Sequence, residues 1–152
     1  MSSDQLTSLV TLLLAVGAAS ACSRGTAVTP EVFGQWEVVG HQGAGVSAMS
    51  DSQAAAWTGR DAYFASNVAR FHRDSCSRPA YRSQSVPADS LFDIGFRIAP
   101  RELGFTSGSN VRITEVSCEG KDWTAPGALI IWADPNRAYT VWDGEFFTLL
   151  RK

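Results

Sequence analysis

Two histidines and three cysteines are the residues of this 152-residue chain that are best suited to bind a metal. His72 and Cys76 are separated by three residues, and only His41 could join them as a further ligand. A metal site needs three or four ligands at matched spacings. The pattern therefore favours ordinary surface or loop histidines, and we expect neither a metal nor another cofactor.

Catalytic nucleophiles have no recognisable setting in this sequence. Serines are plentiful, but none lies in a Gly-x-Ser-x-Gly motif. The glycine-rich run Gly40–Gly45 is not followed by the lysine of a phosphate-binding loop, and a bend after a strand explains it. Catalysis is the weakest of three hypotheses on function, and we predict no catalytic residue.

The aromatic side chains are more informative, because the chain has five tryptophans and eight phenylalanines. In a small domain, most of them are expected to fill the core. Some could instead line a cavity or a protein-facing patch, where large aromatic side chains are favoured. For such a site we predict Trp57 and Trp123 at the rim, and Tyr63, Phe64 and Phe71 in the walls.

Charge and composition narrow the class of protein. The formal net charge is -2 and no block of basic residues is present, which argues against a nucleic-acid partner. With 45% hydrophobic and 18% charged residues, the chain is too apolar to be disordered, and its length suits one domain.

The N-terminal segment differs from the rest of the chain. An apolar run over residues 9–21 has the length of a signal-peptide core and is shorter than the ~20 residues that span a bilayer. The small residues Ala19-Ser20-Ala21 directly precede Cys22, and this segment resembles a bacterial lipobox. The resemblance implies a signal peptide over residues 1–21 and acylation of Cys22.

An acylated Cys22 would anchor the protein to a membrane of the bacterial cell envelope. Ser23, rather than aspartate, follows the cysteine, which favours an outer-membrane lipoprotein facing the periplasm. One alternative is an ordinary leader cut after Ala21, which would give a secreted or periplasmic soluble protein. The other alternative is that the apolar segment is not cleaved and is retained as a helix.

The number of cysteines fits the lipoprotein interpretation. If Cys22 carries lipid, Cys76 and Cys118 remain, and an exported protein would pair them. Such a disulfide closes a long loop and would stabilise the fold by ~3–4 kcal/mol in the chain-entropy model. Two buried free thiols are the alternative.

Residues 22–30 are predicted to form a flexible tether, and residues 31–152 a single β domain. The domain begins with a strand over Glu31–Gly40. A short helix follows over Ser50–Trp57, with Ser50 as N-cap and Gln53 completing a capping box. Gly59 is suited to end this helix.

The middle of the chain is interpreted as extended segments separated by loops. Phe92, Ile94, Phe96 and Ile98 alternate with polar residues or glycine, which favours a strand over Ala88–Ile98. The other predicted strands are Asp61–Asn67, Val68–His72, Ala80–Val86 and Val111–Cys118.

The last third predicts a three-stranded antiparallel meander over Ala128–Leu150. The Asp143-Gly144 pair between two apolar runs is a strong hairpin signal, because a type I′ turn needs positive φ at both central residues. About seven or eight strands, one or two short capping helices and no βαβ rhythm predict an all-β antiparallel barrel. A β-sandwich, or an open sheet packed on one helix, is the alternative.

Gly34-x-Trp36 on the first strand, together with Arg151 at the end of the last, resembles the lipocalin and fatty-acid-binding superfamily. The resemblance implies a lipocalin-like barrel in which the first-strand tryptophan packs at the closed end and the arginine covers its indole, a cation–π contact. Trp36 and Arg151 would then hold the barrel shut.

Two further hypotheses on function follow from this fold. In the first, a lipid-anchored envelope protein binds a small apolar ligand inside the barrel. In the second, the barrel is filled by side chains, and the chain is a protein-interaction or inhibitor module that binds another envelope protein. A cavity of roughly 300 Å³ or more would favour the first hypothesis.

Overall fold

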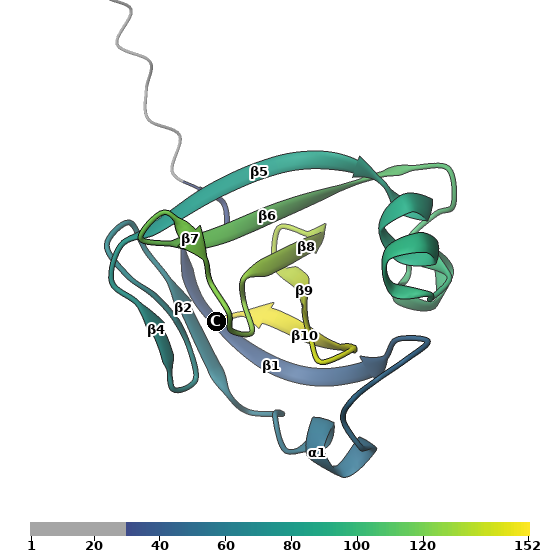
Figure 1. Cartoon of the computed structure of the whole chain (residues 1–152), viewed down its shortest axis with the longest axis horizontal. Coiled ribbons are helices and arrows are strands. Elements are labelled where there is room, and N and C mark those ends of the chain that lie inside the picture. Colours follow the sequence, from purple (N-terminus) through teal and green to yellow (C-terminus); the bar gives the residue numbers. More distant parts are fainter. Residues whose placement is uncertain (1–29) are drawn as a thin grey trace, which may run out of the picture.

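The computed structural model describes residues 30–152, which form one curled antiparallel sheet with short helices at its margins (Figure 1). The predicted signal peptide, the Cys22 anchor and the tether as far as residue 29 lie outside the described residues. The helices within residues 30–152 include none that is long and apolar enough to cross a bilayer.

Ten strands make up the sheet within residues 30–152, rather than the seven or eight expected. Their order is β4-β3-β2-β1-β10-β9-β8-β6-β5, and β7 pairs with β6. In chain order the strands are β1 (Gly34–Gly43), β2 (Asp61–Phe64), β3 (Ala69–Phe71), β4 (Asp74–Cys76), β5 (Pro79–Pro87), β6 (Asn110–Cys118), β7 (Lys121–Asp122), β8 (Leu129–Asp134), β9 (Arg137–Trp142) and β10 (Glu145–Arg151).

The predicted closed barrel is wrong, because the sheet is a half-barrel with two open edges. β4 and β5 are the edge strands, and no ladder joins them among the described residues. They approach each other at one end only. There, the Cys76–Cys118 disulfide ties β4 to β6, and the Tyr81 hydroxyl donates to the Ala65 carbonyl at 2.8 Å.

The C-terminal meander has the predicted form. Asp143 and Gly144 adopt φ values of +50° and +81°, so a two-residue turn joins β9 to β10. β10 then pairs with β1 on its other side, with Trp36 opposite Arg151. The last strand of the chain therefore occupies the middle of the sheet (Figure 1).

The short helix α1 (Asp51–Ala55) begins as the sequence predicts. The Ser50 side chain accepts from the Gln53 backbone N–H, and the Gln53 side chain accepts from the Ser50 N–H at 2.8 Å, which completes the capping box. The helix ends earlier than expected, and Gly59, with φ +84°, belongs to the turn that follows it.

Residues 88–96 are helical, so the strand predicted over Ala88–Ile98 is wrong. A π-helical segment, η1 (Ser90–Phe96), is followed by the 3₁₀ turn η2 (Pro100–Leu103). Phe92 is fully buried, whereas Ile94 is 78% exposed. The apolar alternation therefore does not mark one buried face of a strand.

Side chains cover the enclosed face of the sheet and part of its outer face. One core cluster includes residues of β3, β4 and β6, strands from both arms of the sheet, so it lies on the face that the curl encloses. The second cluster lies on the opposite face and is covered by residues 88–105. Neighbouring residues such as Phe146 and Phe147 point into different clusters, as expected for adjacent positions of one strand.

Candidate functional site

The space enclosed by the curl, where a lipocalin-like carrier would hold its ligand, is occupied by aromatic side chains. The Trp36 and Trp132 rings pack edge to face at 5.8 Å between centroids. Phe64 and Phe71, predicted as cavity walls, are 1% and 0% exposed and belong to the same cluster. Both are core residues of the enclosed face.

The two predicted rim tryptophans also pack inward. Trp123 is 8% exposed and belongs to the enclosed cluster. A Cβ on Gly127 would lie 3.0 Å from the Phe71 ring and 3.4 Å from that of Trp123, so this loop is folded tightly onto the core. Trp57 is half-buried, and its ring lies 5.3 Å from that of Phe147.

Trp36 and Arg151 lie against each other, with the guanidinium carbon 4.2 Å from the centroid of the indole. Arg151 also donates from Nη1 to the Phe33 carbonyl and from Nη2 to the Glu31 carbonyl, both at 2.7 Å. Gly34 makes this approach possible: its φ is +128°, and a Cβ there would lie 3.0 Å from Arg151 Nη1.

This contact does not shut a barrel, because the open edges are β4 and β5. It fixes the segment before β1 to the end of β10 instead. The Trp36 indole N–H completes the arrangement by donating to the Val32 carbonyl at 2.8 Å. Trp36 and Arg151 are therefore positioned to stabilise the fold.

Of the five predicted ligand-binding residues, only Tyr63 is exposed, at 38%. It stands over a hollow of about 640 Å³ on the outer face of β1–β3. The strand register places Gln35 opposite Tyr63 on one side and Arg70 on the other. These three side chains form a row across the hollow, which we call the Tyr63 row.

Charged side chains surround the Tyr63 row. Lys152 donates to Asp61 at 2.6 Å and lies 2.9 Å from Glu37. These hydrogen bonds, first to Asp61 and then to Glu37, raise the pKa of Lys152 and keep its ammonium charged. Arg70 makes no ion pair within residues 30–152 and leaves a guanidinium available in the hollow.

The hollow is therefore equipped for binding. Tyrosine supplies a rigid ring with a hydroxyl, and a guanidinium offers a planar fork of donors to carboxylate or phosphate. The sequence gives no signal for this site, because Gln35, Tyr63 and Arg70 come from three strands and meet only through the register.

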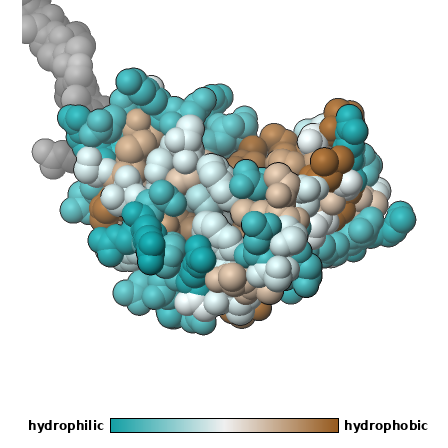
Figure 2. All heavy atoms as spheres, turned by 60° about the horizontal axis from the view of Figure 1, so that its bottom comes forward, coloured by the Kyte–Doolittle hydropathy of each residue, from teal (hydrophilic) through white to brown (hydrophobic). Residues whose placement is uncertain are grey.

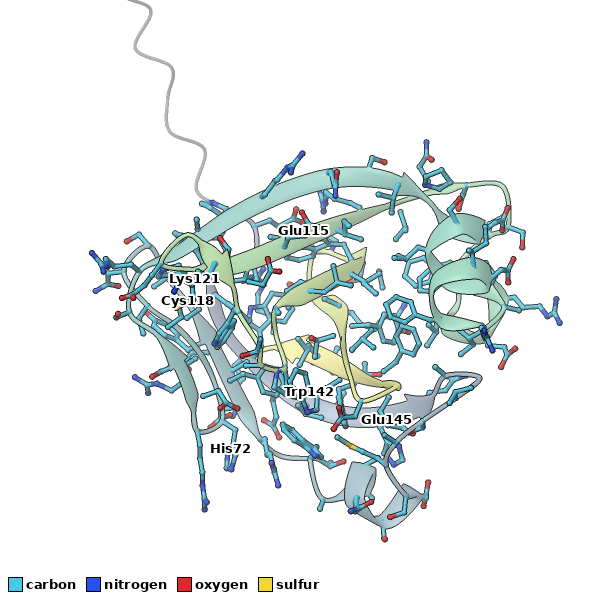
Figure 3. The ribbon with its side chains drawn as sticks, in the orientation of Figure 1. His72, Glu115, Cys118, Lys121, Trp142 and Glu145 are labelled. Carbon is cyan, nitrogen blue, oxygen red and sulfur yellow. A yellow bond between two sulfur atoms is a disulfide. The ribbon has the colours of Figure 1, made fainter. Side chains whose placement is uncertain are left out.

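The two histidines do not come together. His41 Nδ1 lies 3.4 Å from Glu145 Oε2, and its Nε2 lies 3.8 Å from Asp51 Oδ1. His72 lies well apart from Glu145, the partner of His41 (Figure 3). No group of three potential metal ligands converges within residues 30–152.

Glu145 is a buried carboxylate that the sequence does not reveal. It directly follows the Asp143-Gly144 turn, where polar residues are normally exposed, yet it is only 5% exposed. Gly43 lies opposite it in the ladder, and a Cβ at Gly43 would lie 3.1 Å from Glu145 Oε1. The missing side chain leaves room for the carboxylate.

The two cysteines of the folded part are bonded to each other. Cys76 and Cys118 form a disulfide with a Cα–Cα distance of 5.5 Å. Cys76 therefore cannot join His72 as a thiolate ligand of a metal ion. The bridge confirms the pairing expected from the cysteine count.

Comparison with models of protein families, with curated protein sequences and with solved structures gives no significant match. Function is therefore inferred from the geometry of the chain itself.

Proposed function

We propose that the protein is a lipid-anchored protein of the bacterial cell envelope whose lipocalin-like half-barrel is a protein-interaction module. The observation that carries the proposal is the filled interior. Trp36, Trp132, Phe64 and Phe71 occupy the face that a carrier would keep free for its ligand.

Binding of a small apolar ligand inside the half-barrel stays a prediction. Such binding would require these side chains to move. Protein interiors are packed as densely as organic crystals, so a ligand-sized space would open only by displacing several rings. Removing a buried Phe or Trp side chain destabilises a protein by about 3–5 kcal/mol, which gives the scale of that disruption.

The Tyr63 row is the surface we propose for the partner. Tyrosine and arginine are enriched among residues that dominate binding energy at protein interfaces. Arg70 and Tyr63 stand side by side on neighbouring strands, so one partner segment can contact both. A carboxylate on the partner would complement the Arg70 guanidinium.

Two strongly exposed apolar side chains, Ile94 and Val46, do not line the hollow of the Tyr63 row. Figure 2 shows apolar atoms scattered over one face, with a concentration toward the end that carries η1. Ile94 and Val46, at 78% and 70%, are the most exposed large apolar side chains of the described residues. A separate hollow, of about 320 Å³, includes Val46 and Phe96 in its lining.

The anchor rests on Ala19-Ser20-Ala21-Cys22, which precedes the described residues. Replacing Cys22 by alanine should release the protein from the membrane fraction. Unchanged fractionation with membranes would refute acylation at this cysteine.

The binding role is tested on the full chain purified from its own envelope by native mass spectrometry. A reproducible protein partner that is lost with Tyr63→Ala and Arg70→Ala, and retained with Arg73→Ala, supports the proposal. Arg73 is a matched control because it is an exposed arginine just beyond β3. A bound apolar small molecule without any protein partner would overturn the proposal in favour of the carrier.

A further inference from the structure

β5 is a long open edge of the sheet. It runs for nine residues and pairs only with β6 within residues 30–152. The opposite edge, β4, has three residues. An open edge presents a row of backbone donors and acceptors that another strand can use. β5 therefore offers the longer surface for strand pairing.

Three hydrogen bonds near β5 reveal which peptide groups face the open side. Ala88 donates to Ser109, and Glu119 donates to Arg78, so even-numbered residues of this strand exchange bonds with its neighbour. Val116 donates to Ala128, so even-numbered residues of β6 bond to β8, leaving its odd-numbered residues for β5. Bonding alternates along antiparallel strands. The odd-numbered residues of β5 therefore point to the open edge.

The groups on that edge form a symmetric pattern. The odd positions are Pro79, Tyr81, Ser83, Ser85 and Pro87. All five carry a carbonyl, but the two prolines lack an N–H, so only the three central residues donate. These three N–H groups have no hydrogen-bond partner among residues 30–152. The order of backbone donors and acceptors along the edge is therefore symmetric about Ser83.

We infer that a second copy of this chain pairs with β5 across a two-fold axis at Ser83, which joins the two sheets. In antiparallel register Ser83 lies opposite Ser83 of the second copy, and Tyr81 lies opposite Ser85 of the second copy. All three free donors of each copy then meet carbonyls. Pro79 lies opposite Pro87 of the second copy, so no donor faces a position that lacks a partner.

The side chains agree with this register. Arg82 is the only charged residue of β5, and it lies opposite Gln84 of the second copy rather than another arginine. Like charges directly opposite each other would weaken the pair. Two-fold symmetric contacts of this kind are the commonest arrangement of oligomers.

The dimer is expected to be reversible. Edge-to-edge pairing of two nine-residue strands buries less than the roughly 1,200 Å² of a standard interface. Terminal prolines are also a device that keeps edges unpaired, which makes a monomer the competing outcome. The inference is independent of what the Tyr63 row binds.

Cysteine cross-linking tests the register directly, in the full chain with Cys22→Ser to remove the remaining odd thiol. Opposed residues of a hydrogen-bonded antiparallel pair have Cα atoms about 5.5 Å apart, within reach of a disulfide. Ser83→Cys should therefore form a covalent dimer under mild oxidation. Ser85→Cys is the matched control, because its two copies would lie about 13 Å apart along the strands. Equal cross-linking of both variants, or of neither, overturns the inference.

Charge substitution tests the same pair without oxidation. Ser83→Lys and Ser83→Asp should each be monomeric in sedimentation velocity under conditions in which the unchanged chain dimerises, and mixing the two should restore the dimer. Ser83 is exposed, but its hydroxyl is hydrogen-bonded to the buried Thr114 hydroxyl at 2.8 Å, so circular dichroism must first show that both variants keep the fold. A monomeric unchanged chain at about 100 μM, or variants that dimerise equally well alone, would contradict the proposal. If a variant fails to fold, the cysteine pair decides.

Discussion

Arg151 is expected to hold the two ends of the described chain together, and replacing it by methionine should be strongly destabilising. The guanidinium donates to the carbonyls of Phe33 and Glu31 at 2.7 Å and to that of Pro135 at 3.2 Å. It also covers the Trp36 indole at 4.2 Å. Methionine keeps apolar contact with the ring but loses every side-chain hydrogen bond and the charge.

The size of the effect follows from these contacts. A hydrogen bond from a charged group contributes about 1.5–3 kcal/mol, and a partly exposed cation–π contact about 1 kcal/mol. Arg151 is half-buried, so solvent screening lowers each of the two short bonds to about 1 kcal/mol. The sum is a loss of about 3 kcal/mol for Arg151→Met, or a fall in Tm of about 10 °C for a folded part of this size. Arg151→Lys should lose about 2 kcal/mol, since an ammonium cannot reach both carbonyls while covering the ring.

Urea denaturation followed by circular dichroism gives the free energy of unfolding of each variant. Arg137→Met is the matched control: Arg137 lies on the neighbouring strand and pairs with Asp134 at 3.3 Å, and both side chains are about half exposed. Exposed pairs contribute about 0–1 kcal/mol. A loss for Arg151→Met no larger than that of the control would refute the assigned role. Full recovery with lysine would show that charge alone matters, not the geometry of the fork.

Three further predictions concern the disulfide, the loop after β1 and the half-buried Tyr81. Replacing Cys76 and Cys118 by alanine should lower the free energy of unfolding by about 4 kcal/mol in the chain-entropy model, because the bridge spans 42 residues; a loss below about 1 kcal/mol in denaturant titration contradicts this. Gly45→Ala should lower Tm, since its Cβ would lie within contact distance of the Arg97 carbonyl, while Gly40→Ala, with nothing within 4 Å, should not; equal melting curves would disprove the close approach. Burial raises the pKa of Tyr81 from 10.0 to about 12. Its stabilising contribution is thus complete below pH 10 and is lost as the pH rises toward 12. The stability advantage over Tyr81→Phe should therefore shrink between pH 10 and about 12, and a constant difference would contradict it.

Local signals in the sequence predicted local structure well. Asp143-Gly144 specifies its turn through backbone conformation alone, and Ser50 with Gln53 specifies a helix start through two reciprocal hydrogen bonds. The pairing of β1 with β10 was also predictable, from an aromatic on one strand and an arginine on the other.

The segment around η1 shows why the spacing of apolar residues can suggest the wrong secondary structure. Phe92 and Phe96 are four residues apart, and residues at that spacing share a face in a strand and in a helix alike. Ile94 decides between them, and it is exposed. The helix is favoured because the face of β10 that carries Phe146 needs an apolar cover, which is a tertiary requirement that the local pattern does not contain.

Neither the closure of the sheet into a barrel nor the hollow on its outer face can be predicted from local sequence patterns. Whether β4 meets β5 depends on how strongly the sheet curls, which no short motif encodes. Tyr63 and Arg70 were separate residues in the sequence, and a hairpin register makes them neighbours. Phe64, one position along, points to the opposite face of the same strand.

The central place of β10 has a consequence for how the protein is made. During synthesis β1–β4 and β5–β9 exist before β10, yet β1 and β9 are joined only through it. Until the last seven residues of the sheet leave the ribosome, the chain is two incomplete sheets with unpaired inner strands. Folding to the native state must therefore wait until β10 has left the ribosome, and removal of β10 would leave two fragments of a sheet rather than a slightly smaller one.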